Sequence, residues 1–204
     1  AVAIGSAAFS MQDILLEPYG GEILGLSVGE TTRLTGLWAF GTMIGFGWAA
    51  HSLQHGAQMY RVAARGLLIG ISAFSAVIFA EPLQINALFH LGAFGIGLGG
   101  GLFAVGTMLA AMGIADRSDS GLVVGAWGAV QATAIGAAML AGGVIKNTIN
   151  ALALNGSLGE AMMTPAAGYL VVYSFEIILL FLCLAVLGPL TRSEEHTSEL
   201  QSRR

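Results

Sequence analysis

The chain has 204 residues, of which 55% are hydrophobic and 10% are charged, with a mean hydropathy of +0.78 and a net charge of −4. Soluble domains carry about 25% charged residues, so this composition indicates an integral membrane protein surrounded by membrane lipid. The acidic balance provides no basic surface and argues against nucleic acid as a partner. The single cysteine, Cys183, excludes a disulfide within the chain.

Six apolar segments are candidates for crossing a bilayer, which takes about 20 residues. In chain order they are residues 1–16, 33–53, 66–80, 85–115, 121–145 and 169–190. We expect the first to be cut short at its start, because the chain opens inside an apolar run. The fold class predicted is therefore all-α: a polytopic membrane protein with six transmembrane helices.

The distribution of basic residues predicts the orientation of these spans. The connections at 51–66 and 115–121 carry Arg61, Arg65 and Arg117, whereas the opposite side carries Arg33 and Lys146. Because cytoplasmic loops are enriched in Lys and Arg, we expect these two connections to lie in the cytoplasm.

The last part of the chain changes character abruptly after Leu190. Residues 192–204 read RSEEHTSELQSRR, which is wholly polar and resembles the translation of a sequencing adaptor. We predict a six-helix transmembrane half-bundle over residues 1–191, followed by a non-native tail over residues 192–204. A genuine cytoplasmic tail is the alternative.

Small residues recur at three- or four-residue spacing in several spans, which lets helix backbones approach closely in lipid. The pattern predicts a tightly packed bundle. It comprises Gly41 and Gly45 in the second span, Gly66 and Gly70 in the third, and Gly121, Gly125, Gly128, Ala132 and Gly136 in the fifth.

The stretch from Ser6 to Gly25 is predicted to form an apolar helix that carries Gln12, Asp13 and Glu17. Two carboxylates four residues apart share a helix face, and an ionisable residue within a membrane costs roughly 2.5–3.5 kcal/mol on insertion. We therefore expect a proton- or ligand-binding site here. Pro18 leaves open that the helix breaks and that Glu17 lies at the membrane surface.

Two further residues are candidate proton- or ligand-binding groups. Glu176 lies near the middle of the sixth span, where it should face the bundle interior or a cavity, or form a purely structural polar contact. His90 lies early in the fourth span. It is either a hydrogen-bonded interior histidine or a metal ligand, for which a chlorophyll-type magnesium is one candidate.

Other motifs do not support chemistry. His51 and His55 are four residues apart, but they lack the Glu of a zinc helix and a third ligand, so no metal site is predicted. There is no Ser-His-Asp set, cysteine nucleophile or phosphate-binding loop, and we expect the protein not to be an enzyme.

Three runs taken together resemble the PucC-type proteins of photosynthetic bacteria, also called the bacteriochlorophyll delivery family of the major facilitator superfamily. They are SMQDILLEPYGGEILGLSVGETT, GIGLGGGLFAVGTMLAAMGIADR and GLVVGAWGAVQATAIGAAMLAGG. The resemblance covers residues 1–190. It implies that the chain is the C-terminal half of a twelve-helix major-facilitator-type bundle, with an N-terminal six-helix half as its partner.

The resemblance also implies a function: assisting the assembly of light-harvesting complexes in a bacterial inner or intracytoplasmic photosynthetic membrane. The protein would handle antenna subunits or bacteriochlorophyll, which is the candidate bound cargo. The loop at 47–66 keeps Arg61, Arg65 and Gly66 of the superfamily's glycine-acid-arginine motif but lacks its acid. The alternative is a proton-coupled transporter of a small solute that uses the acidic residues of the first and sixth spans.

Overall fold

The computed structural model describes the backbone of residues 1–114 and 119–202 and the side chains of residues 1–113 and 119–189. The protein is 88% helical, with no strand in the described part. The elements are α1 (Val2–Ser10), the 3-10 turn η1 (Met11–Ile14), α2 (Leu16–Glu22), α3 (Val28–Gln54), α4 (Met59–Leu83), α5 (Asn86–Ile114), α6 (Ser120–Leu154), the 3-10 turn η2 (Glu160–Met162) and α7 (Ala167–Ser202).

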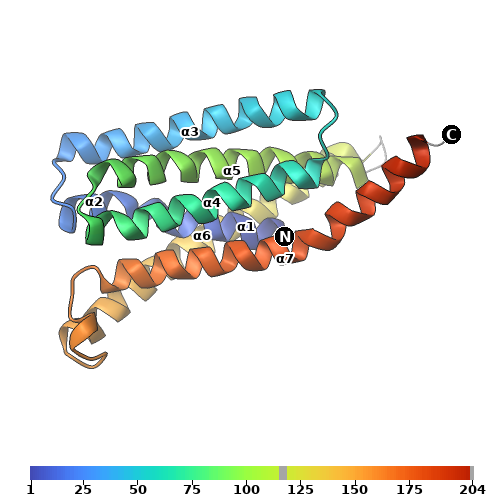
Figure 1. The fold of residues 1–204 in the computed structure, drawn as a ribbon. Helices are drawn as coiled ribbons and strands as arrows, with labels where there is room; N and C mark the ends of the chain where they lie inside the picture. The colour runs from blue at the N-terminus through green and yellow to red at the C-terminus, as the bar shows by residue number, and fades with distance from the viewer. Residues whose placement is uncertain (115–118, 203–204) are drawn as a thin grey trace.

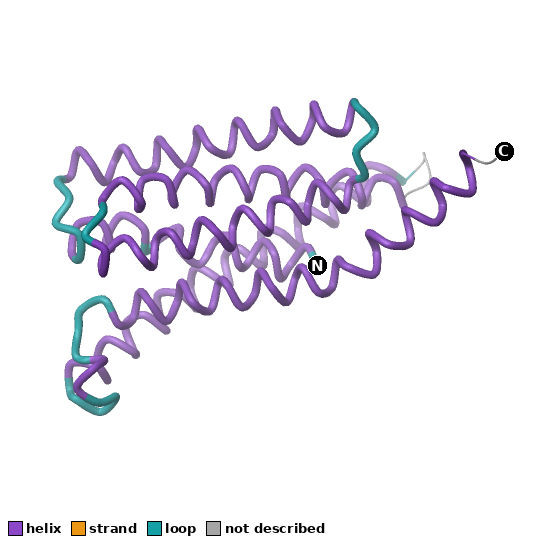
Figure 2. Tube along the Cα trace, in the orientation of Figure 1, coloured by secondary structure: helices purple, strands orange, loops and turns teal. Residues whose placement is uncertain are grey.

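The long helices lie roughly side by side, with α5 packed against both α3 and α4 (Figure 1). The short helix α1 lies against α6, α7 and α5, so the first segment of the chain is held inside the bundle. The connections at 23–27, 84–85 and 155–166 lie at one end of the bundle, and the connection at 55–58 lies at the other (Figure 2).

Four helices are long and apolar enough to cross a membrane: Met59–Leu83, Asn86–Gly113, Ser120–Leu154 and Ala167–Pro189. They confirm the predicted third to sixth segments by length and composition. The predicted second segment is a helix, α3, but it does not belong to this set. Its glycines, threonines and the charged Glu30 and Arg33 lower its mean hydropathy. The first segment is too short once it is broken.

The prediction of one continuous helix at the start of the chain is wrong. The chain passes from α1 into η1 and restarts as α2 after Leu15, whose φ is −112°. Pro18 explains the position, because a proline ring clashes with the carbonyl four residues earlier, here that of Ile14, and cannot donate to it. Within α2, Pro18 occupies the first turn, where no backbone N–H donor is required.

Several predicted boundaries also need correction. Helix α4 begins at Met59, so Arg61 and Arg65 belong to the helix and not to the preceding connection. Pro82 lies inside the last turn of α4, and Gln84, the residue that follows the helix, has a left-handed conformation with a φ of 55°. Helix α6 extends to Leu154, nine residues beyond the predicted end.

Two sequence predictions lie partly outside the described residues. The connection at 115–121 contains residues 115–118, including Arg117, which the structure does not describe. The backbone of α7 continues as helix through Ser202, but the side chains of residues 190–204 are not described, so the predicted non-native tail stays a prediction.

The glycine stripes explain the close contact of α5 with its neighbours. A Cβ atom at Gly45 would lie 2.5 Å from the carbonyl oxygen of Leu98, and one at Gly66 would lie 2.5 Å from that of Gly99. The predicted packing role of the stripes in α3 and α4 is confirmed. In α6, by contrast, no atom lies within 4 Å of a Cβ built at Gly121, Gly125, Gly128 or Gly136, so within the described part of the chain that stripe has no packing partner.

Candidate functional site

The break after α1 places Gln12 beside Glu176, which lies 164 positions later in the chain. The backbone N–H of Gln12 donates to Glu176 Oε1 at 2.7 Å. A continuous helix would use that N–H for its own i−4 bond, so the transition to η1 frees it for the carboxyl group. The side chain of Gln12 donates to Asp13 Oδ1 at 2.5 Å and thereby links the two acidic groups.

Glu176 is fully buried, at 0% exposed, on the inner face of α7. Its second oxygen, Oε2, and the side-chain oxygen of Gln12 have no hydrogen-bond partner in the described structure, and neither have the hydroxyl groups of Tyr19 and Tyr173. An unsatisfied buried polar group costs about 1–3 kcal/mol, and such groups are uncommon in native interiors. We call the group of Gln12, Asp13, Glu176, Tyr19 and Tyr173 the first polar cluster. Its unpaired polar atoms leave it able to bind a proton or a polar group.

Asp13 and Glu17 are exposed and line one cavity of about 250 Å³, together with Thr35 and Trp38 of α3. The Thr35 hydroxyl donates to the carboxylate of Glu17. The two carboxylates thus share a face despite the break in the helix. A second cavity of about 180 Å³ also borders Trp38 and is lined by residues of α1, α3, α5 and α6, including Ser6, Ser10, Thr42 and Gln131.

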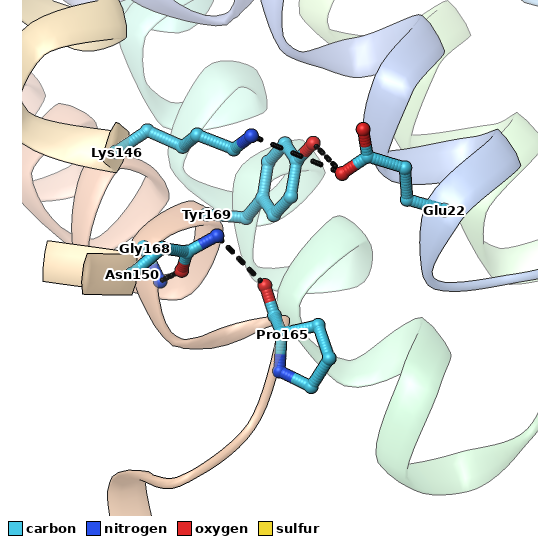
Figure 3. Close-up of polar contacts among 6 residues, drawn as sticks. All are labelled: Glu22, Lys146, Asn150, Pro165, Gly168 and Tyr169. Atoms are coloured by element: carbon cyan, nitrogen blue, oxygen red, sulfur yellow. Dashed lines mark hydrogen bonds and ion pairs between the residues drawn. The ribbon is translucent and has the colours of Figure 1, made fainter. Parts of the chain in front are cut away.

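A second polar cluster joins α2, α6 and α7 at the end of the bundle that holds the 155–166 connection (Figure 3). The hydroxyl group of Tyr169 donates to Glu22 Oε2 at 2.6 Å, and Lys146 Nζ lies 3.8 Å from the same oxygen. Lys146 also lies 4.6 Å from the centroid of the Tyr169 ring. Asn150 caps the start of α7, because its side chain accepts from the Gly168 N–H at 2.7 Å.

This second cluster was not predicted from the sequence. Glu22 and Tyr169 are 147 positions apart, and no local pattern connects them. Only the four-residue spacing of Lys146 and Asn150, which puts both on one face of α6, is visible in the sequence. The ring of Tyr19 joins the two clusters. Its centroid lies 5.3 Å from the centroid of the Tyr169 ring and 5.4 Å from that of the Tyr173 ring.

His90 is not part of either cluster. It lies in the second turn of α5, where its Nδ1 is 2.7 Å from the carbonyl oxygen of Asn86. It lines a separate groove between α3 and α5. Of the five predicted site residues, the structure therefore brings together Gln12, Asp13, Glu17 and Glu176, and it places His90 elsewhere.

The fold and the polar core define the class of protein as an α-helical, multi-pass membrane protein with ionisable groups inside its bundle. The chain matches the model of the family described as "PUCC protein" over residues 1–195, and it belongs to this family.

Individual relatives agree with this assignment. The chain is 54% identical over 191 residues to the "Uncharacterized protein in puhA-bchM intergenic region" of Rhodobacter capsulatus, covering 94% of this chain and 40% of the relative. It is 41% identical over 192 residues to "Protein PucC" of Cereibacter sphaeroides, covering 94% and 41%. It is 34% identical over 145 residues to the "Bacteriochlorophyll synthase 44.5 kDa chain" of Rhodobacter capsulatus, covering 68% and 33%.

The chain spans about two-fifths of the length of the first two relatives. No solved structure matches it.

Proposed function

We propose that this protein assists the assembly of photosynthetic light-harvesting complexes in a bacterial inner or intracytoplasmic membrane, by handling bacteriochlorophyll or antenna subunits. The observation that carries the proposal is the match to the PUCC family over residues 1–195. A relative named as a bacteriochlorophyll synthase chain supports pigment as the chemical class of cargo. The role is that of a membrane factor and not of an enzyme.

The character of the surface supports an apolar cargo. Many large hydrophobic side chains are exposed on the helices, among them Phe40 of α3, Leu91 of α5 and Phe181 of α7. The groove between α3 and α5 is lined almost wholly by apolar groups. In a membrane these side chains contact lipid tails, and an apolar pigment or a membrane-embedded antenna subunit can pack against them in place of lipid, whereas a small polar solute cannot.

The proposed architecture is the C-terminal half of a twelve-helix major-facilitator-type bundle. Helix α3 has 27 residues, which is about 40 Å of helix and enough to cross a bilayer, and the broken α1–α2 segment would supply the sixth crossing. The partner would be an N-terminal six-helix half, consistent with the two-fifths of each relative that this chain spans. The uncovered glycine face of α6 is available for that contact.

The proposal is tested in a pigmented phototroph that lacks the gene and receives the full-length protein. We expect the deletion to lower the antenna absorption bands while free pigment synthesis continues, and the purified protein to carry pigment or antenna subunits. Normal antenna absorption in the deletion strain, together with a purified protein free of both, would overturn the proposal.

A proton-coupled transporter of a small solute is the second candidate, and one observation favours it. Glu176 is buried, forms no ion pair in the described part of the chain, and keeps one oxygen without a partner. Carboxyl groups of this kind mark proton relays in membrane proteins. In a transporter, Asp13→Asn should abolish uptake but leave antenna assembly intact. In an assembly factor, any effect of Asp13→Asn should be seen in antenna assembly.

A further inference from the structure

A groove on the outer face of the bundle contains one polar side chain among apolar ones. It has a volume of about 580 Å³ and lies between α3 and α5, lined by Leu37, Phe40, Ala87, His90, Leu91 and Phe94. Phe40 is 51% exposed and Leu91 is 65% exposed, so a wide apolar surface is open beside the imidazole. The rings of Phe40 and Phe94 lie 6.2 Å apart and form an aromatic wall.

The hydrogen bond of His90 defines its tautomer. Its Nδ1 lies 2.7 Å from the carbonyl oxygen of Asn86, and a carbonyl oxygen only accepts, so Nδ1 must carry the proton. In the neutral imidazole the other nitrogen, Nε2, is then an acceptor with a free lone pair. No described residue donates a hydrogen bond to Nε2. This arrangement, with one nitrogen bonded to a backbone carbonyl and the other open, is the one that metal-ligating histidines use.

One acidic side chain interacts with this imidazole, but it already has hydrogen-bond partners. Glu30 interacts electrostatically with His90, but its carboxylate accepts from the backbone N–H of Ser27 at 2.8 Å and from the Ser27 hydroxyl at 2.7 Å. His90 lines an apolar groove, and neither leucine nor phenylalanine side chains can donate a hydrogen bond to its Nε2.

A free metal ion does not fit this groove. The described residues contain no group of three or more His, Cys, Asp or Glu side chains that could hold a metal ion. Free Mg²⁺ prefers oxygen ligands and keeps several waters, so a single imidazole would not capture it. A magnesium ion already held by four ring nitrogens is different, because it needs only one axial ligand and brings a large, flat, apolar macrocycle.

We propose that the groove between α3 and α5 binds a magnesium macrocycle of the bacteriochlorophyll class, with His90 Nε2 as the axial ligand and Phe40 and Phe94 against the ring. This inference rests on the proposed handling of bacteriochlorophyll and identifies where that pigment is held. Binding by the neutral imidazole forms one Mg–N bond and requires no change of oxidation state.

The chain contains a matched control in His55. Its Nδ1 lies 2.7 Å from the carbonyl oxygen of His51, which gives it the same tautomer as His90. It is exposed at the end of α3 beside the His51 ring, with centroids 4.2 Å apart, and does not line the groove. A histidine effect that depends on the groove should therefore appear at position 90 and not at position 55.

The test measures binding of bacteriochlorophyll and of its magnesium-free form to the purified full-length protein in detergent, by fluorescence and by the absorption bands that respond to magnesium coordination. We expect the wild type and His55→Leu to prefer the magnesium form by at least about 10-fold, the scale on which ligand-shell changes alter metal affinity. His90→Leu should bind both forms equally. His90→Gly should regain the preference when imidazole is added.

A second variant tests the groove without changing His90, so its result does not depend on whether the substitutions at position 90 fold. Ala87→Trp fills the groove and leaves the imidazole in place, and it should weaken binding of both pigment forms. The site is overturned, while the proposed function stands, if the wild type binds both forms equally, if His90→Leu keeps the preference, or if Ala87→Trp binds like the wild type. If the wild type binds neither form, the site and pigment handling both fail, and only the antenna-subunit role remains for the deletion strain to decide.

Discussion

The tight contact between α3 and α5 gives a stability prediction with an internal control. Gly45 and Gly47 lie two positions apart on α3. A Cβ at Gly45 would meet the backbone oxygen of Leu98 at 2.5 Å, whereas one at Gly47 would have no atom within 4 Å. A backbone atom cannot turn aside as a side chain can, so Gly45→Ala must push α3 away from α5.

The difference between the two variants isolates the cost of that clash. Replacing glycine by alanine within a helix is favourable by roughly 0.5–1 kcal/mol, and this gain is common to both sites. Overpacking costs about 1–3 kcal/mol and applies only to Gly45→Ala. A domain of this size shifts its melting temperature by roughly 2–4 °C per kcal/mol. Gly45→Ala should therefore melt about 2–12 °C below Gly47→Ala.

The assay is thermal unfolding of the purified full-length protein in one detergent, with both variants and the wild type measured side by side. Gly47→Ala should melt at or slightly above the wild type. If Gly45→Ala melts as high as Gly47→Ala, the α3–α5 contact is not as close as described, and the packing role of this stripe is refuted.

Three further predictions concern polar contacts. Glu176→Ala should lower the melting temperature more than Glu176→Gln, because only Gln keeps an acceptor for the Gln12 N–H, and an unpaired buried donor costs about 1–3 kcal/mol; equal losses would show that this bond is not made. Tyr169→Phe should lose less stability than Tyr169→Ala in the same assay, because the ring keeps its contact with the lysine of α6; equal losses would mean that only the hydroxyl matters. The Ser27 hydrogen bonds lower the pKa of Glu30, which lies in the first turn of α3 outside the predicted span, so their stabilising effect should be present above the usual carboxyl range and disappear as pH falls through the lowered pKa. Ser27→Ala should flatten that pH dependence of the melting temperature, and an unchanged profile would contradict the assignment.

The sequence was sufficient to predict the structural features that depend on a single segment of the chain. Four spans could be predicted because the apolar character of a segment and the length needed to cross lipid are properties of the segment itself. A break near Pro18 could be anticipated for the same reason. The helix restarts after Leu15 because the proline ring clashes with the carbonyl of Ile14, four residues before Pro18.

The glycine stripes are a feature whose packing partner could not be predicted from the sequence. The pattern on α6 reads like the patterns on α3 and α4, yet only the latter two have a helix against them in the described structure. A small residue permits close approach but does not select a partner, so the sequence could not distinguish a covered stripe from an open one.

The sequence by itself thus determined that this is a helical membrane protein of the PUCC family and which ionisable residues stand in apolar surroundings. Only the tertiary structure decided that the Gln12 backbone meets Glu176 across 164 positions, that Glu22 meets Tyr169, and that His90 stands apart in its own groove. The physical reason is that hydropathy is a property of each segment of the chain and can be read from that segment alone. A buried carboxyl group instead takes its partner from whichever backbone group a broken helix leaves free, and packing alone brings the two together.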